Sequence, residues 1–180
     1  SFAQQTFTSS NNGYWHLSST WGGSGVPGVG DTAIIDGETV VIQNDAGGGG
    51  AITIDRLSFT SGSLTLRNDL TLTNASSNSG TSSGTTLTVE SGTLTISDNN
   101  FTNAGTISIG SASKFVFSSG TGDTFTNTGT VDITSNSNSF GAIIFNGTYS
   151  GSVNNMIYSR YVEGNDSGNG AWDLIGPPLN

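Results

Sequence analysis

The chain has 180 residues, and its 4 basic against 13 acidic side chains give it a net charge of −9. A surface of this sign repels a phosphate backbone, which argues against nucleic-acid binding. The sequence has no cysteine, which excludes disulfides, a thiol nucleophile and thiolate metal sites, and it has no apolar run long enough to predict insertion into a membrane.

Small polar residues dominate the composition. Ser, Thr, Asn and Gly occur 28, 25, 18 and 27 times, which is more than half of the chain. The apolar residues alternate with them in short runs, for example around Leu70 and Phe115, and this period of two is typical of strands. No window has a convincing helical period, so we expect an all-β fold.

The first fifty residues differ from the rest. Residues 1–3 have the small-x-small pattern that ends a secretory signal peptide, so we expect them to be a remnant of such a signal and the protein to be secreted. Residues 4–50 contain the aromatic residues Tyr14, Trp15 and Trp21, which we interpret as a cap over the first coil of a repeat structure. The alternative is a platform on which sugar rings stack, and these three would then bind a glycan.

Four acidic residues lie close together in the turn-rich part of this cap: Asp31, Asp36, Glu38 and Asp45. Hard cations take carboxylate oxygens, so Ca²⁺ is the one cofactor that the sequence suggests, although the spacing matches no EF-hand loop. The competing interpretation is that these are solvated turn carboxylates. The same segment, residues 32–42, predicts two short strands joined by a turn.

Residues 51–155 carry an internal repeat. The run FTNAGTISI begins at Phe101, and FTNTGTVDI begins 24 residues later at Phe125. A sandwich or barrel needs no identity between its strands, whereas parallel coils stack equivalent positions on one another. We therefore predict a right-handed parallel β-helix in which Phe101 stacks on Phe125 and Asn103 on Asn127.

Residues 156–180 break the repeat again. They predict a strand from Met156, a polar turn and a second strand around Trp172, after which Pro177 and Pro178 stop any ladder. We interpret this part as a C-terminal cap or junction of irregular strands, so that residues 4–180 form a single solenoid domain.

Several segments of the chain, taken together, form a recognisable pattern. They are YWHLSSTWGG from Tyr14, a following Val-Pro and Gly-Asp, rungs with Gly-Thr and Phe-Thr-Asn, and then RYV from Arg160 and WDLIGPPL from Trp172. In these the chain resembles the secreted, β-helical, adhesin-like surface proteins of Bacteroidetes. The resemblance implies a β-helix exported to the cell exterior. Such proteins usually continue to a C-terminal sorting domain, which these 180 residues do not contain.

Catalysis is not expected. Polysaccharide lyases of β-helical shape use Lys or Arg beside a Ca²⁺-bound uronate, but the basic residues of this chain fall in different rungs: Arg56, Arg67, Lys114 and Arg160. Paired carboxylates could hydrolyse glycosides, yet nothing in the sequence sets the separations among the candidates. These candidates are Glu90, Asp98, Asp123 and Asp132.

Thr-x-Thr pairs such as Thr86 and Thr88 recur in neighbouring rungs and are similar to the flat faces of ice-binding solenoids. Asp132 places a charge in this array, which spoils a regular lattice match. Ice binding is therefore not expected either.

The function we expect is that of an extracellular structural or adhesive module of the cell surface that associates end to end with copies of itself. A solenoid ends in unpaired strand edges, which can pair with another chain. We expect two groups of residues to make this contact, one at each end: Gln4, Thr6 and Phe7, and Tyr158, Tyr161 and Trp172. The alternatives are a glycan-binding adhesin and, less favoured, a lyase-like enzyme.

Overall fold

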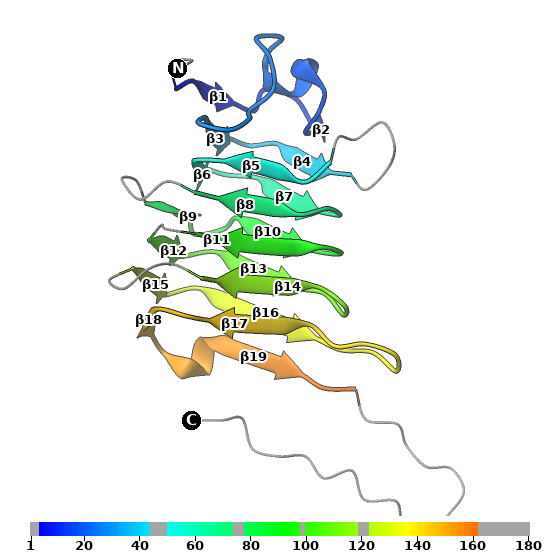
Figure 1. Ribbon diagram of the computed structural model, residues 1–180, viewed down its shortest axis with the longest axis vertical. Helices are drawn as coiled ribbons and strands as arrows, with labels where there is room; N and C mark the ends of the chain where they lie inside the picture. The colour runs from blue at the N-terminus through cyan, green and yellow to red at the C-terminus, as the bar shows by residue number, and fades with distance from the viewer. Residues whose placement is uncertain (1–3, 44–49, 74–77, 98–99, 119–122, 162–180) are drawn as a thin grey trace, which may run out of the picture.

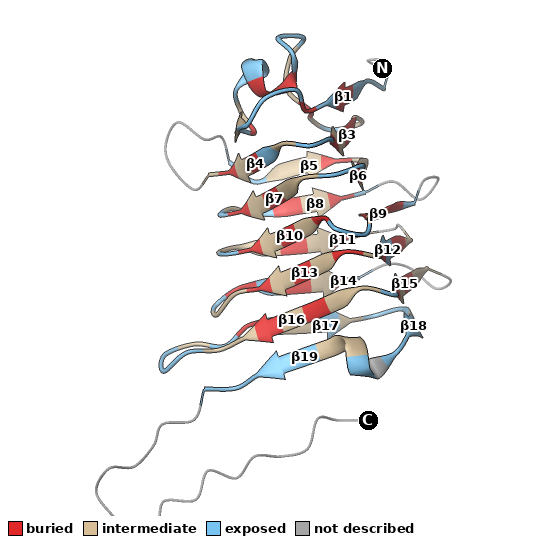
Figure 2. Cartoon of the chain, turned by 180° about the vertical axis from the view of Figure 1, so that it is seen from behind, coloured by how far each residue is buried: buried red, intermediate tan, exposed pale blue. Residues whose placement is uncertain are grey.

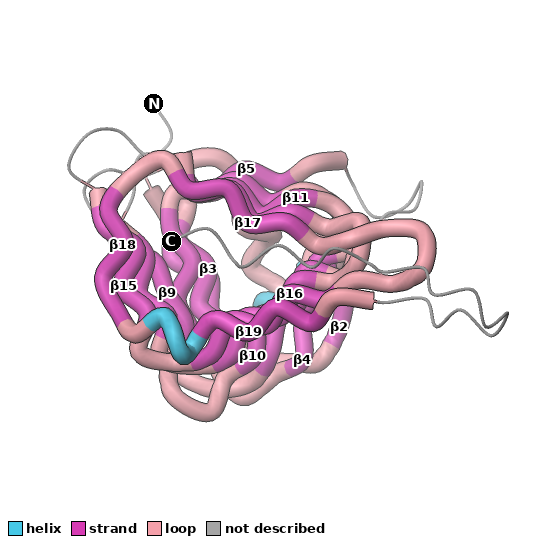
Figure 3. Tube along the Cα trace, turned by 90° about the horizontal axis from the view of Figure 1, so that it is seen from below, coloured by secondary structure: helices cyan, strands magenta, loops and turns pink. Residues whose placement is uncertain are grey.

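The computed structural model describes residues 4–43, 50–73, 78–97, 100–118 and 123–161, and these form a β-solenoid of about six turns (Figure 1). Each full turn gives one strand to each of three parallel sheets, which we call A, B and C. Followed from A through B to C, the chain winds as a right-handed coil (Figure 3). The predicted parallel β-helix is thus confirmed.

The strands of each sheet follow in order along the solenoid axis, and every pairing between them is parallel. Sheet A contains β1 (Thr6–Thr8), β3 (Thr32–Ile35), β6 (Arg56–Phe59), β9 (Ser79–Thr81), β12 (Phe101–Asn103), β15 (Thr124–Asn127) and β18 (Thr148–Gly151). Sheet B contains β2 (Gly13–Tyr14), β4 (Thr39–Ile42), β7 (Ser63–Leu66), β10 (Thr86–Val89), β13 (Thr106–Ile109), β16 (Thr130–Thr134) and β19 (Met156–Ser159). Sheet C contains β5 (Ile52–Ile54), β8 (Leu70–Leu72), β11 (Thr93–Ile96), β14 (Lys114–Phe117) and β17 (Ala142–Phe145). Two short 3₁₀ helices are the helical elements of the described residues: η1 (Ser18–Trp21) and η2 (Val153–Asn155).

The core is a stack of inward-facing columns, because alternate residues of each strand point inside. In sheet B one such column runs through Leu64, Leu87, Ile107 and Val131, all buried. Burying each side chain of this size stabilises the fold by about 1.5 to 3 kcal/mol. Figure 2 shows the resulting alternation of buried and intermediate positions along the strands of the middle coils.

The repeat occupies the register that the sequence predicts. Phe101 lies opposite Phe125 and Asn103 opposite Asn127 in the parallel pair β12 and β15. The two phenyl rings are stacked with their centroids 5.9 Å apart, and both are fully buried. Identical residues therefore form internal ladders from coil to coil.

The corners between sheets A and B use glycine for two reasons. Gly62 has φ +88, which L side chains rarely adopt, and a Cβ there would lie 2.4 Å from the carbonyl oxygen of Glu38 in the previous coil. Only glycine relieves both the strained backbone and the close approach.

Two boundaries differ from the sequence prediction. The regular ladder begins earlier than residue 51, because β3 and β4 already pair with β6 and β7. These two strands do not form a hairpin, since the turn at Gly37 sends them into different sheets. At the other end β19 is a regular member of sheet B paired with β16, and residues 162–180 lie outside the described part.

No helix among the described residues has the length and apolar character that a bilayer crossing requires.

Candidate functional site

The large apolar side chains that are exposed lie at the two ends of the solenoid. At the N-terminal end they are Tyr14, Leu17 and Val29. In the last turn and a half they are Phe140, Ile144, Ile157, Tyr158 and Tyr161. The described residues between 30 and 139 contain none, so the exposed large apolar side chains are confined to the terminal coils.

The N-terminal end is closed by Trp15 and Trp21. Their rings meet edge to face with centroids 4.8 Å apart, and only 1% and 2% of their surfaces is exposed. Both indole N–H groups are satisfied inside, because Trp15 Nε1 donates to the carbonyl of Pro27 and Trp21 Nε1 donates to that of Trp15. The interpretation of these two residues as a cap over the first coil is confirmed, and the glycan-platform prediction is wrong for them because both rings are buried.

Tyr14 is the one member of the predicted platform at the surface, with 41% of its area exposed. Its ring stacks on that of His16 with the planes 4° apart. Leu17 and η1 follow directly, so this pair lies on the outer side of the cap. A single tyrosine ring stacked on a histidine offers an apolar contact but no aromatic cage.

Within the described residues the predicted Ca²⁺ site is not assembled. Both carboxylate oxygens of Asp31 accept hydrogen bonds from the backbone N–H groups of Gln5 and Gly28. Asp36 lies at the β3–β4 corner beside Glu38, and no three acidic or histidine side chains of the described residues are placed to share a cation. Asp45, the fourth expected ligand, lies outside the described residues. Asp31 is thus explained as a turn carboxylate.

The first strand leaves one edge unpaired, as expected. β1 pairs with β3 on one side and ends sheet A on the other. Gln4 and Thr6 are exposed there, but Phe7 is buried in the core and is no contact residue. The prediction for Phe7 is therefore wrong, because the alternation of the strand turns its side chain inward.

The C-terminal end is more open than the N-terminal end. Sheets A, B and C end at β18, β19 and β17, and within the described residues each of these strands has an unpaired edge. Partly buried apolar side chains sit beneath these edges: Ile143, Phe145, Tyr149 and Met156. Figure 2 shows the last strands largely in the colours of intermediate and exposed residues. Tyr158 and Tyr161 are about half exposed here, as expected for a contact surface, and Trp172 lies outside the described residues.

A cavity of about 430 Å³ lies at the corner of this end, between the loop of residues 135–140 and the chain that follows β19. Besides that loop, it is lined by Tyr158, Arg160 and Tyr161. We call it the corner cavity. Three of its lining residues are aromatic: Tyr158, Tyr161 and, from the loop, Phe140, which is 68% exposed.

Hydrogen bonds centred on Asn136 fix the loop of the corner cavity. Its Oδ1 accepts from the backbone N–H groups of Asn138 and Ser139, and its Nδ2 donates to Ser111 Oγ in the coil above at 2.7 Å. The other wall, formed by the chain at the end of β19, is bonded to this loop as well, because Ser135 donates its N–H and its hydroxyl to the carbonyl of Ser159. Both walls are therefore held in place without a ligand.

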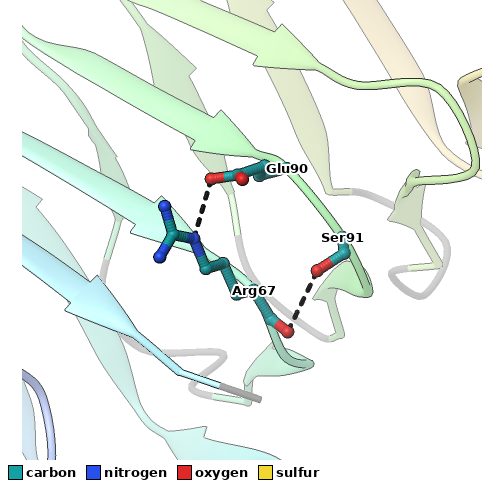
Figure 4. A network of polar contacts seen from close by, with 3 residues as sticks. All are labelled: Arg67, Glu90 and Ser91. Carbon is teal, nitrogen blue, oxygen red and sulfur yellow. Dashed lines mark hydrogen bonds and ion pairs between the residues drawn. The ribbon is translucent and has the colours of Figure 1, made fainter. Parts of the chain in front are cut away.

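The basic residues do not converge on one site. Arg56 on β6 donates from Nε to the carbonyl of Asn78, Lys114 is exposed on β14, and Arg160 lines the corner cavity. Arg67 forms an ion pair of 2.9 Å with Glu90 one coil on (Figure 4). The hydrogen bond to Glu90 and the negative charge of that carboxylate raise the pKa of the Arg67 guanidinium.

The carboxylates considered for glycoside hydrolysis also come from separate places. Glu90 follows β10, Asp123 precedes β15, and Asp132 lies on the outer face of β16. Asp98 lies outside the described residues. Asp132 is in register with Thr88 and Ser108 on that face, so the charge expected in the Thr-x-Thr array is present.

Comparison with protein-family models, with curated proteins and with solved structures finds no match to this chain. The assignment of a site therefore depends on the structure itself. Sequence reasoning had placed Tyr158 and Tyr161 at a contact surface but had missed Phe140 and the corner cavity. The signal available was the length of the corner, since residues 135–141 between β16 and β17 outnumber residues 67–69 between β7 and β8.

Proposed function

We propose that this chain is a non-catalytic structural module of the cell exterior that associates end to end with copies of itself into a filament. The observation that carries the proposal is the confinement of exposed large apolar side chains to the two ends of the solenoid. Exposed apolar surface in a patch marks an interaction site, whereas scattered single residues need no explanation. Export to the cell surface is supported by the resemblance in sequence.

The two ends differ, and this decides the kind of assembly. The N-terminal end is closed by Trp15 and Trp21, whereas the C-terminal end offers the unpaired edges of β17, β18 and β19. The cap of one copy would therefore lie on the open end of the next. Such a heterologous contact does not close on itself, and repeated addition gives a fibre.

The contact differs from a simple continuation of the ladder. Towards the capped end sheets A and C end at β1 and β5, which are three residues long each, whereas β2 in sheet B is two residues long and contacts η1. We therefore assign most of the contact to the side chains of Tyr14, Leu17 and Val29. Backbone pairing by β1 adds to it in sheet A.

The test uses one lysine at each end and one in the middle. Val29→Lys changes the capped end and Ile157→Lys the open end. Thr88→Lys is the matched control, because Thr88 lies within the outward column of sheet B whose last member is Ile157, so only Ile157 would have a stacked copy as its next neighbour. Sedimentation velocity and negative-stain images should show filaments for the unchanged protein and for Thr88→Lys, but monomers for the two end variants.

Mixing the two end variants tests whether the contact is heterologous. Val29→Lys keeps an intact open end and Ile157→Lys keeps an intact cap, so the mixture should form one-to-one dimers that grow no further. An unchanged protein that stays monomeric at high concentration would refute the filament. Filaments that survive both end substitutions would refute the assigned surfaces.

A glycan-binding adhesin is the second candidate function. The observation that favours it is the corner cavity, which combines aromatic rings with amide and hydroxyl groups. The aromatic residues that suggested a glycan site in the sequence, Trp15 and Trp21, do not support it, since both are buried.

A further inference from the structure

We propose that the corner cavity binds an acidic saccharide, a sugar chain that carries carboxylate groups. This inference deepens the second candidate function and does not depend on end-to-end association. The volume of the corner cavity, about 430 Å³, falls within the range of roughly 300 to 1,000 Å³ that is usual for small-ligand pockets. Its lining contains the two kinds of group that such a ligand requires, apolar rings and polar donors.

The aromatic residues supply the apolar part of the site. Phe140, Tyr158 and Tyr161 are each 46% or more exposed, so their ring faces are accessible. An aromatic face is electron-rich and apolar, and it suits the C–H-bearing face of a sugar ring. No aliphatic side chain from the described part of the chain lines the cavity, which disfavours a lipid or an apolar peptide as its occupant.

The charge of the site selects an anion. Among the residues that the structure describes, Arg160 is the only charged one in the lining, and none of the acidic ones is there. Within the described residues the one ion pair joins Arg67 and Glu90, so Arg160 has no carboxylate partner in this part of the chain. In a protein of net charge −9 an isolated cation beside aromatic rings favours a carboxylate, which a guanidinium can bind with two parallel hydrogen bonds.

The polar groups are held ready for the ligand. The Asn136 side chain fixes its own loop, since its Oδ1 holds the backbone of Asn138 and the hydroxyl of Ser139 and its Nδ2 donates to Ser111. Tyr161 is anchored through its backbone N–H, which donates to Ser135 Oγ. Because both walls are ordered by internal hydrogen bonds, binding loses little conformational entropy.

The experiment is a titration of the ¹⁵N-labelled protein with trigalacturonate, followed by NMR. Neutral maltotriose is the comparison ligand. EDTA is present to exclude binding of the sugar through Ca²⁺. The protein concentration is kept low enough for sedimentation to show a monomer. Trigalacturonate should shift the amide signals of residues 135–141 and 158–161 saturably, and maltotriose should bind at least about tenfold more weakly.

Three variants separate the contributions. Arg160→Gln should weaken trigalacturonate at least about tenfold and leave maltotriose unchanged. Tyr161→Ala should weaken both sugars by about two- to tenfold. Arg56→Gln removes the same charge from sheet A, far along the axis from the cavity, and should bind as the unchanged protein does.

Three results would overturn the proposal: no saturable shift in the corner residues, equal affinity for the two sugars, or an equal loss in Arg56→Gln and Arg160→Gln. The last would show a general charge effect without a site. Since the titration is read on the monomer, failure of the filament leaves this test unaffected. A negative titration likewise does not bear on the proposed filament.

Discussion

The side-chain amide of Asn103 donates a hydrogen bond of 2.8 Å to Oδ1 of Asn127, which occupies the same position one coil further on. Both side chains are buried in the interior of the solenoid. Thr81 in the coil before donates its hydroxyl to Asn103 Oδ1, and Asn127 Nδ2 reaches the hydroxyl of Tyr149 at 3.4 Å. A polar column thus runs through the apolar core, and its members satisfy one another, as buried polar groups must.

Replacing Asn103 with Ala should destabilise the fold by about 2 to 4 kcal/mol, because it leaves the Thr81 hydroxyl and the Thr130 carbonyl without their partner. Urea unfolding followed by circular dichroism measures the change. Asn154→Ala, at an exposed position, is the control and should lie within about 0.5 kcal/mol of the unchanged protein. Equal stabilities of the two variants would show that the column contributes nothing.

Phe125 is the aromatic centre of the core. Its ring lies near those of Phe101, Phe115 and Phe145, and its side chain is fully buried. Phe125→Ala should therefore reduce the free energy of unfolding by about 3 to 5 kcal/mol. Phe140→Ala removes the same ring from an exposed position and should change it by less than about 0.5 kcal/mol. A loss below about 1 kcal/mol for Phe125→Ala would contradict the stacking.

The fold could be predicted because a parallel solenoid repeats its contacts in the sequence. The two FTN runs lie one coil apart, so their identity reports directly that Phe101 lies on Phe125. The end units could not be delimited in this way, because β1 and β3 share no motif with the later rungs and β4 shares with β10 only a Gly-x-Thr-apolar-x-apolar pattern. Their membership of the sheets depends on backbone pairing, which leaves little trace in the side chains.

The candidate sites were harder to foresee. Trp15 and Trp21 were recognised as a cap or a platform, and only the packing of one ring on the other decides between them. Asp31 and Asp36 are close in sequence, but a solenoid sends consecutive segments around different sides. The corner cavity joins residues 135–140 to Tyr158 and Arg160 through the stacking of one coil on the next, a relation that spacing alone does not show.

Gly129 should tolerate no side chain. A Cβ at this position would lie 2.0 Å from the carbonyl oxygen of Gly105 in the coil before, so Gly129→Ala must push two coils apart. We expect a loss of about 1 to 3 kcal/mol, the usual effect of overpacking, seen as a lower midpoint of thermal unfolding. Gly50→Ala is the control, since nothing lies within 4 Å of its Cβ position, and an equal effect of both changes would contradict the close approach.

Incubation with pectin, alginate or chondroitin and Ca²⁺ should yield no unsaturated product absorbing in the near ultraviolet. Arg56, Arg67 and Arg160 belong to different coils, and Arg67 is engaged with Glu90, so these described residues form no pair of base and charge stabiliser. Product formation that is lost in Arg160→Gln would contradict this and assign catalysis to the corner cavity. Product that persists in that variant would show that catalysis takes place elsewhere on the solenoid.

Salt should strengthen the end-to-end association. Each copy carries a net charge of −9, so two copies repel one another at long range, and at physiological ionic strength this repulsion is screened beyond about 8 Å. The contact itself is assigned to apolar side chains such as Leu17, Val29 and Ile157, and excluded salts strengthen apolar burial. The concentration needed for half-assembly, measured by light scattering, should therefore fall as sodium chloride is raised, and fall further in sodium sulfate. Thr88→Lys should show the same trend with a slightly smaller slope, because one added positive charge reduces the repulsion between copies without changing either end. Assembly that weakens with salt would instead indicate a contact between opposite charges, with Arg160 at the open end as the first residue to replace.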